Sequence, residues 1–137
     1  MSTLETATVG DVMHVGVLSC PADAPLTEVA RIMADHHVHA VIVNGLGSDR
    51  WGVVSDLDLV GRFDAHDVQT ATAGTMSATP AVVVAPADPL WEATRVMHDY
   101  DVHHLLVVDP ANRRPIGVLS TSDVAAVIAG RVPGGGP

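Results

Sequence analysis

Apolar residues recur along the chain in two different spacings, and the order of these spacings occurs twice. Near residues 26–36 and again near 90–100, they recur every three or four positions, which is typical of one buried face of an amphipathic helix. We expect two helices of about ten residues, with Asp88 as N-cap and Pro89 as the first helical residue of the second. The residues on the two faces are Leu26, Val29, Ala30 and Met33, and Leu90, Ala93, Thr94 and Met97.

Runs of aliphatic and β-branched residues surround each helical segment. Val15–Pro21 and Ala81–Pro86 precede the helices and predict strands, and the second run, with four consecutive aliphatic residues, predicts a strand buried on both faces. A further run follows each helix, then a turn rich in Gly, Asn, Asp or Pro, then a short run that begins with glycine, so each copy predicts a hairpin. The hairpin strands are Val38–Val43 with Gly52–Ser55, and Val102–Val108 with Gly117–Ser120.

A final helix is expected after each hairpin, from Asp56 to about Phe63 and from Thr121 to about Gly130. Each copy therefore reads as strand, helix, strand, strand, helix, which is an α/β fold. We predict one repeat over residues 6–63, a linker over 64–69, a second repeat over 70–130 and a flexible tail over 131–137. Two such repeats can cover each other's apolar sheet faces, packed with pseudo-two-fold symmetry through their small sheets.

One motif appears at the same place in both copies, where the last strand meets the last helix. It is Gly-x-x-Ser-x-x-Asp, which runs from Gly52 to Asp58 and from Gly117 to Asp123 with identical spacing. Ser-x-x-Asp before a helix is also a helix-capping arrangement, so the motif has a structural explanation that needs no ligand.

Composition narrows the classes of partner and compartment. The formal net charge is −9, with seven basic residues and no lysine, which argues against a nucleic-acid surface. A single cysteine, Cys20, excludes an internal disulfide and is expected to pack as a small apolar residue. No apolar run has membrane-spanning length and the N-terminus lacks the features of a signal peptide, so we expect a cytoplasmic protein without membrane contact.

The whole pattern resembles a tandem pair of cystathionine-β-synthase (CBS) domains, also called a Bateman module. The matching features are Met13 and Met76 at the heads of the copies, the Pro-Ala-Asp turns, and the helices that carry Met33 and Met97. They continue through Val102–Asp109 and the two closing motifs, so the resemblance covers roughly residues 6–130.

The resemblance implies a regulatory binding module and not an enzyme. Such pairs bind an adenosine-containing ligand (AMP, ADP, ATP or S-adenosylmethionine) in two clefts between the repeats, and no cofactor is required. Family members usually dimerise through their helices, so we expect a homodimer. Ligand occupancy would then bias a separate effector protein.

The resemblance also implies roles for individual residues. The motif aspartates would hold the ribose hydroxyls, the serines and the residues after them would lie near ribose and phosphate, and the closing strands would enclose the adenine. A carboxylate suits this role because it can accept from both vicinal hydroxyls. The expected binding residues are His39, Val53, Ser55, Asp56 and Asp58, together with His103, His104, Val118, Ser120, Thr121 and Asp123.

Two departures from the family pattern make the clefts unequal. Ala40 and His104 stand where ligand-binding members commonly have a phosphate-facing basic residue, and Leu57 and Ser122 stand where an arginine often precedes the aspartate. We therefore expect the cleft of Asp58, facing His103 and His104, to be the better nucleotide site. The cleft of Asp123, facing His39 and Ala40, is expected to be weak, empty or suited to a less charged ligand.

Two other functions stay open at the level of sequence. The first is a structural or interaction protein whose clefts are vestigial; Trp91, near a helix start, fits either an interface or ordinary packing. The second is a divalent-metal binder, because histidine is a common ligand of zinc and nickel. The histidines concerned are His36, His37 and His39, and His98, His103 and His104.

Overall fold

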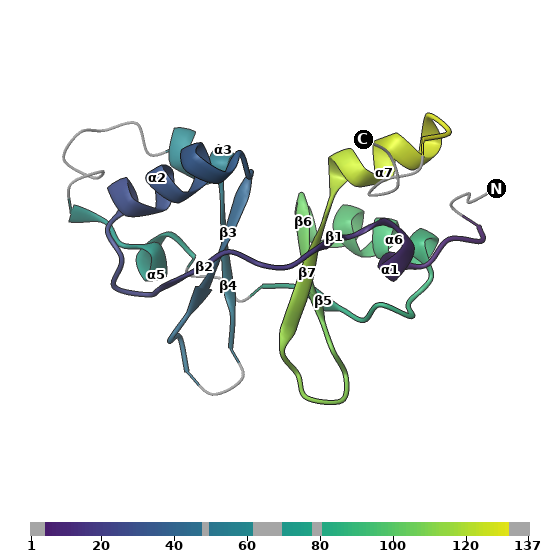
Figure 1. The fold of residues 1–137 in the computed structure, drawn as a ribbon, viewed down its shortest axis with the longest axis horizontal. Helices are drawn as coiled ribbons and strands as arrows, with labels where there is room; N and C mark the ends of the chain where they lie inside the picture. Colours follow the sequence, from purple (N-terminus) through teal and green to yellow (C-terminus); the bar gives the residue numbers. More distant parts are fainter. Residues whose placement is uncertain (1–4, 48–49, 62–69, 78–80, 132–137) are drawn as a thin grey trace. The chain divides into compact units, whose positions relative to one another are not determined.

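A computed structural model describes residues 5–47, 50–61, 70–77 and 81–131 of the chain. The chain forms two compact units. The first-repeat unit is Leu18–Ala81, and the second-repeat unit combines Met1–Val17 with Val82–Pro137. The N-terminal segment thus belongs to the unit built mostly from the second repeat, and β1 lies beside β7 in Figure 1.

The first-repeat unit contains a three-stranded sheet in the order β2-β3-β4. Its central strand pairs in parallel with β2 and antiparallel with β4, which closes the predicted hairpin. Helices α2 and α3 contact each other, and both lie on the same side of the sheet (Figure 1). The elements of this unit are β2 (Ser19–Pro21), α2 (Leu26–His36), β3 (Ala40–Asn44), β4 (Gly52–Ser55), α3 (Asp56–Val60) and α5 (Ala73–Met76).

The second-repeat unit repeats this arrangement with one more strand, in the order β1-β7-β6-β5. Strand β6 pairs in parallel with β5 and antiparallel with β7, and β1 adds antiparallel to the outer edge of β7. Helices α6 and α7 contact each other on one side of this sheet (Figure 1). The elements are α1 (Val9–Val12), β1 (His14–Val15), β5 (Val83–Val84), α6 (Leu90–Tyr100), β6 (His104–Val108), β7 (Pro115–Ser120) and α7 (Thr121–Ile128).

The predicted helices and hairpins are confirmed. On the predicted helical faces, Leu26, Val29 and Met33 are buried, as are Leu90, Ala93 and Met97. The remaining two members were wrong, because Ala30 is exposed and Thr94 is half-buried at the edge of its face. Each helix ends where the pattern stops, with a left-handed residue at His37 and Asp101 whose backbone N–H donates to the last turn. The last helices begin at the predicted residues, and α7 ends at Ile128, two residues before the predicted Gly130. Helix α3 ends at Val60, and its expected end, Phe63, lies outside the described residues.

Three local predictions were wrong. The expected strand Val15–Pro21 is two strands in two sheets, because the chain turns at Gly16, which has φ +92°, and crosses from one unit to the other. The strand expected over Ala81–Pro86 is reduced to Val83–Val84 at a sheet edge, where Val83 is 53% exposed instead of buried on both faces. Asp88 does not cap α6: its Oδ2 accepts from the backbone N–H of Ala85, and Pro89 is the N-cap.

The head of each repeat docks on the Pro-Ala-Asp turn of the other repeat, an exchange that the sequence pattern did not reveal. In the second-repeat unit the backbone N–H of Gly10 donates to Pro86 O at 2.8 Å. In the first-repeat unit the N–H of Gly74 donates to Ala22 O, also at 2.8 Å. The heads start with matched capping boxes at Thr8 and Thr72, so Val12 is equivalent to Met76, and the expected match of Met13 with Met76 is one residue off.

Each unit has an apolar core of its own, and each core includes the exchanged head. Val9 and Val12 are buried beside Leu90, Ala93 and Leu105 in the second-repeat unit. Ala73 is buried in the first-repeat unit with Val29, Met33, Val41 and Val54. Burial of apolar surface is the main stabilising contribution to folding, so each unit depends on residues from both repeats.

Repeats and units therefore divide the chain at different places. The predicted linker (64–69) and all but the first residue of the predicted tail (131–137) lie outside the described residues. Among the helices that the structure describes, none combines the length and apolar character that crossing a membrane requires.

Candidate functional site

The first motif joins β4 to α3 through a reciprocal pair of hydrogen bonds. Ser55 Oγ accepts from the backbone N–H of Asp58 at 3.2 Å, and Asp58 Oδ2 accepts from the backbone N–H of Ser55 at 2.8 Å. This capping box holds one carboxylate oxygen of Asp58 in place. The side chain is exposed, and no described residue contacts its other oxygen, Oδ1.

The second motif has the same capping box between β7 and α7. Asp123 Oδ2 accepts from the backbone N–H of Ser120 at 2.8 Å and from Ser120 Oγ at 3.0 Å. Ser122 Oγ lies 2.8 Å from Ser120 Oγ and adds a further hydroxyl contact. The capping interpretation of Ser-x-x-Asp is therefore confirmed for both copies.

The two motif aspartates differ in the state of their remaining oxygen. Asp123 Oδ1 lies 2.7 Å from His14 Nε2, and the aspartate is only 4% exposed. Both oxygens of this carboxylate thus have partners inside the second-repeat unit, whereas Asp58 is exposed and its Oδ1 has no hydrogen-bond partner among the described residues. The two aspartates occupy the same position in identically spaced motifs, but their carboxylates have different hydrogen-bond partners.

The residues next to the motifs are held by contacts that differ between the units. In the first-repeat unit His39 Nδ1 lies 2.9 Å from Asp56 Oδ2, and His39 O accepts from the backbone N–H of Asp56. In the second-repeat unit the corresponding backbone bond runs from Thr121 N–H to His103 O at 3.0 Å. The histidine before the middle strand is therefore tied to the first helical residue in both units.

The predicted adenine-enclosing residues lie on the closing strands. Val53 pairs with Ile42, and Val118 lies between Leu106 and His14 in the sheet. His104 is half-buried at the start of β6, opposite Ser120. The expected facing of Asp58 by His103 and His104 joins residues of different units and stays a prediction.

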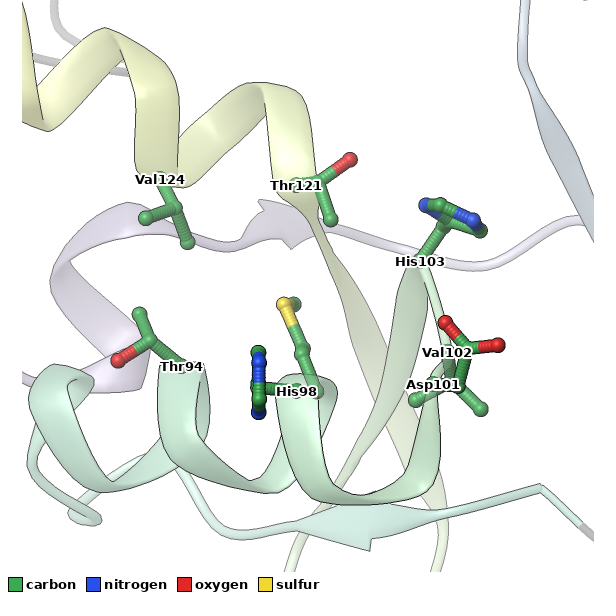
Figure 2. A pocket seen from close by; sticks show the side chains of 8 residues that line it. Thr94, His98, Asp101, Val102, His103, Thr121 and Val124 are labelled. Atoms are coloured by element: carbon green, nitrogen blue, oxygen red, sulfur yellow. The ribbon is translucent and has the colours of Figure 1, made fainter.

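A pocket of about 310 Å³ lies beside the second motif, between α6 and α7 (Figure 2). Thr94 and His98 line it from α6, Thr121 and Val124 from α7, and Asp101 and His103 from the segment that leads into β6. The pocket brings His103 and Thr121 together, but Asp123 does not line it.

The cysteine and histidine side chains do not form a metal-binding cluster in the part of the chain that the structure describes. No three His, Cys, Asp or Glu residues there come together as metal ligands would, although His98 lies 3.8 Å from Asp99. Cys20 is 3% exposed, and burial, with a smaller contribution from the Glu28 carboxylate, raises the pKa of its thiol. A protonated buried thiol is unreactive, so Cys20 acts as a small apolar core residue.

Sequence reasoning missed His14. This residue lies 109 positions from Asp123, since 123 − 14 = 109, and only the docking of β1 on β7 brings the two together. Counted from the matched caps Thr8 and Thr72, the residue at the same place in the other copy is Ala78, whose side chain has no hydrogen-bond donor. An alignment of the two heads on their capping threonines would have shown this difference.

Comparison with known proteins places the fold in one family. The family model of the CBS domain matches residues 9–65 and 73–130. Hypoxic response protein 1 of Mycobacterium tuberculosis is 28% identical over 120 residues, which cover 86% of this chain and 82% of that protein. A solved structure of Hypoxic Response Protein I with two coordinated zinc ions is 28% identical and has a TM-score of 0.69, covering 88% of this chain and 98% of that chain.

Two more distant solved structures share the fold. The CBS domain pair of protein MJ0100, in complex with 5′-methylthioadenosine and S-adenosyl-L-methionine, is 17% identical, with a TM-score of 0.78 and coverage of 90% and 97%. The CBS domain of a bacterial CNNM/CorC family Mg²⁺ transporter, in complex with ATP, is 22% identical, with a TM-score of 0.77 and coverage of 94% and 92%. Because both repeats match the family model and the fold recurs in these pairs, the chain belongs to the CBS domain family and contains a tandem pair of CBS domains.

Proposed function

We propose that this chain is a regulatory module that binds an adenosine-containing ligand through Asp58 and passes its occupancy to a separate effector protein. One observation carries the proposal: Asp58 is exposed, with one oxygen held by the backbone N–H of Ser55 at 2.8 Å and the other without a hydrogen-bond partner among the described residues. An oriented carboxylate with a free oxygen is suited to accept hydrogen bonds from the vicinal hydroxyls of a ribose.

The residues around Asp58 supply the rest of a nucleoside site. Ser55 and Asp56 lie at the same strand-to-helix junction, and His39 is 2.9 Å from Asp56. Val53 lies on β4, the strand that leads into this junction. Related CBS pairs have been solved with ATP and with 5′-methylthioadenosine and S-adenosylmethionine, which supports the same ligand class here. CBS pairs are generally regulatory modules, and we therefore assign no catalytic role to these residues.

The test is ligand binding by the Asp58→Asn variant. Asparagine keeps an oxygen for the capping bond to Ser55 but replaces the open acceptor with an NH₂ donor, which cannot accept from a ribose hydroxyl. We expect isothermal titration of the wild-type chain with AMP, ADP, ATP and S-adenosylmethionine to show binding of at least one. We expect Asp58→Asn to weaken that binding by about tenfold or more, since hydrogen bonds to a charged group contribute about 1.5–3 kcal/mol.

Thermal unfolding supplies the control for this experiment. Asp58→Asn should keep the melting temperature of the unliganded protein within a few degrees, because the capping box is retained. A bound ligand raises the melting temperature by mass action, by about 2.7 kcal/mol of stability at a hundredfold excess over Kd. If millimolar adenosine ligands neither bind nor shift the wild-type melting temperature, the proposal is wrong.

Zinc binding is the second candidate, favoured by one observation. The solved Hypoxic Response Protein I, at 28% identity, holds two coordinated zinc ions. Against it, no group of three ligand side chains converges within the described residues, and a structural zinc site needs about four ligands. Titration with ZnCl₂ decides: stoichiometric binding that a chelator reverses would establish this function, and an absent heat signal would reject it.

We also propose that the chain forms a homodimer, as family members commonly do. Sedimentation equilibrium across a range of protein concentrations measures this directly. A mass close to twice the chain mass of 14.2 kDa is the expected result, and a monomer at all concentrations would contradict it.

A further inference from the structure

We infer that His14 occupies the ribose-binding oxygen of Asp123 from within the chain, so that the second motif is closed to ligand unless His14 moves away. This inference rests on the proposed function, because it concerns the same class of ligand at the second motif. His14 thereby determines which of the two motifs binds. The consequence is one working nucleoside site per chain, at Asp58.

Asp123 is only 4% exposed and both of its carboxylate oxygens have partners, so it presents no open acceptor to a ribose. Its Oδ2 accepts from the backbone N–H of Ser120 at 2.8 Å, and its Oδ1 is 2.7 Å from His14 Nε2. A ligand hydroxyl would need the same Oδ1 that His14 uses, since the capping oxygen is already held on two sides by Ser120. Nε2–H can donate whether the imidazole is neutral or protonated, so the closed state does not depend on the charge of His14.

The backbone places His14 at this carboxylate reliably. His14 stands opposite Val118 in the antiparallel pair of β1 and β7, and the neighbouring N–H of Gly16 donates to Ile116 O at 2.8 Å. Asp123 follows the C-terminal end of β7, in the first turn of α7, and Val118 lies two residues before that end. The sheet therefore fixes the backbone of His14 next to the turn of α7 that carries Asp123.

The side chain of His14 is nevertheless able to leave. It is 71% exposed, whereas the side chain of Asp123 is 5% exposed, so a rotation of the imidazole into solvent opens the carboxylate without disturbing the core. A ligand must compete with the closed state, and its apparent affinity falls in proportion to the fraction of molecules that are open. Removal of the imidazole should therefore tighten binding at the second motif.

The first-repeat unit shows what the motif is like without this contact. Asp58 has the same capping box, but its Oδ1 has no contact with any described residue. Counted along the sequence from the matched caps, the residue that corresponds to His14 is Ala78, which lies outside the described residues and whose side chain has no hydrogen-bond donor. His14→Ala therefore introduces the residue type that the other copy has at the corresponding sequence position.

The experiment measures AMP binding in a background where the first motif is disabled. Asp58→Asn alone should bind AMP weakly, and adding His14→Ala should tighten binding by about tenfold or more. Adding Asp123→Asn to this pair should remove the gain. The direction is diagnostic, because loss of a hydrogen-bond donor that helped to hold the nucleotide would weaken binding and not tighten it.

Two further variants serve as controls. His14→Gln keeps an amide donor of similar reach and should leave the second motif closed, which separates loss of the donor from loss of bulk. His36→Ala removes another exposed histidine, at the last residue of α2, and should not change AMP affinity. Unchanged melting temperatures would show that all variants are folded.

The outcomes separate this inference from the proposed function. If AMP binds the wild-type chain through Asp58 but His14→Ala gives no gain, the closure by His14 is refuted and the proposed function stands. If His14→Ala gives the gain at Asp123 while Asp58→Asn has no effect on the wild-type chain, the closure is supported and the role of Asp58 is refuted. Failure of AMP to bind any variant would overturn both.

Discussion

The glycine at the start of each motif is required because the head segment of the other repeat packs directly against it. A Cβ at residue 117 would lie 2.5 Å from the carbonyl oxygen of His14, and a Cβ at residue 52 would lie 2.5 Å from Ser77 Oγ. Both distances are shorter than a carbon atom tolerates, so only glycine lets the head segment pass this close. The glycine at the first position of the motif is therefore required by packing, independently of the role of the aspartate at the last position.

We predict that Gly117→Ala destabilises the protein by about 1–3 kcal/mol, because overpacking against a backbone atom forces the chain to shift. The clash is with β1, so His14 should also be displaced from Asp123. Urea unfolding measures the loss of stability. Gly61→Ala is the matched control: Gly61 has φ −66° and its nearest atoms would be 3.6 Å from a Cβ, so that change should be neutral or slightly stabilising. Equal effects of the two substitutions would contradict the explanation.

At the scale of elements, the short head helices α1 and α5 connect the two repeats. Each has only four residues and would not be stable alone, but each carries fully buried residues and donates backbone hydrogen bonds to the other repeat's turn. Val9, from the first repeat in sequence, is 0% exposed in the core of the second-repeat unit. A substitution in a head helix should therefore lower the local stability of the unit on which that helix docks.

We predict that Val9→Ala loosens the second-repeat unit, at a cost of about 1–3 kcal/mol for the buried methyl groups removed. Amide hydrogen exchange should rise in α6 and β6 while α2 and β3 are affected less. Val29→Ala is the matched counterpart, since Val29 is also 0% exposed but lies in the first-repeat core, and it should give the reverse pattern. Faster exchange in α2 and β3 after Val9→Ala would show that the heads do not belong to the units assigned here.

At the scale of the whole molecule, charge limits the ligand that a CBS pair of this composition can hold. The chain carries a net charge of −9, with seven basic residues and no lysine. A field of this sign repels phosphate groups and does so more strongly for ATP than for AMP or adenosine. The departures at Ala40 and Leu57 act in the same direction, because neither side chain can attract a phosphate.

We predict that binding of magnesium-free ATP becomes tighter, by a few-fold, when the salt concentration is raised from about 0.01 M to about 0.15 M. Salt shortens the screening length from about 30 Å to about 8 Å and thereby reduces repulsion between like charges. Adenosine is uncharged and provides the control, with an affinity that should stay constant. Calorimetric titration at both salt concentrations measures the effect, and weaker ATP binding at high salt would indicate a basic site that this proposal does not contain.

The sequence alone determined those features that depend on neighbours along the chain. The α2 and α6 helices follow from apolar spacing, the hairpins follow from alternating runs around turn residues, and the capping boxes follow from Ser-x-x-Asp. Because this local pattern occurs twice in the same order, the sequence was sufficient to predict a CBS pair, and the family match confirms that prediction. Roles of individual residues in ligand binding were predicted from that resemblance and stay predictions.

The tertiary structure decided what depends on contacts between distant segments. Hydrophobic periodicity shows which face of an element is buried but not which partner buries it, so the run from Val15 to Pro21 gave no sign that it supplies strands to two sheets. For the same reason Asp58 and Asp123, identical in their motifs, became an open carboxylate and a carboxylate closed by His14. Their difference arises because the head of the first repeat docks on the second-repeat unit, where a histidine meets an aspartate 109 residues away (123 − 14).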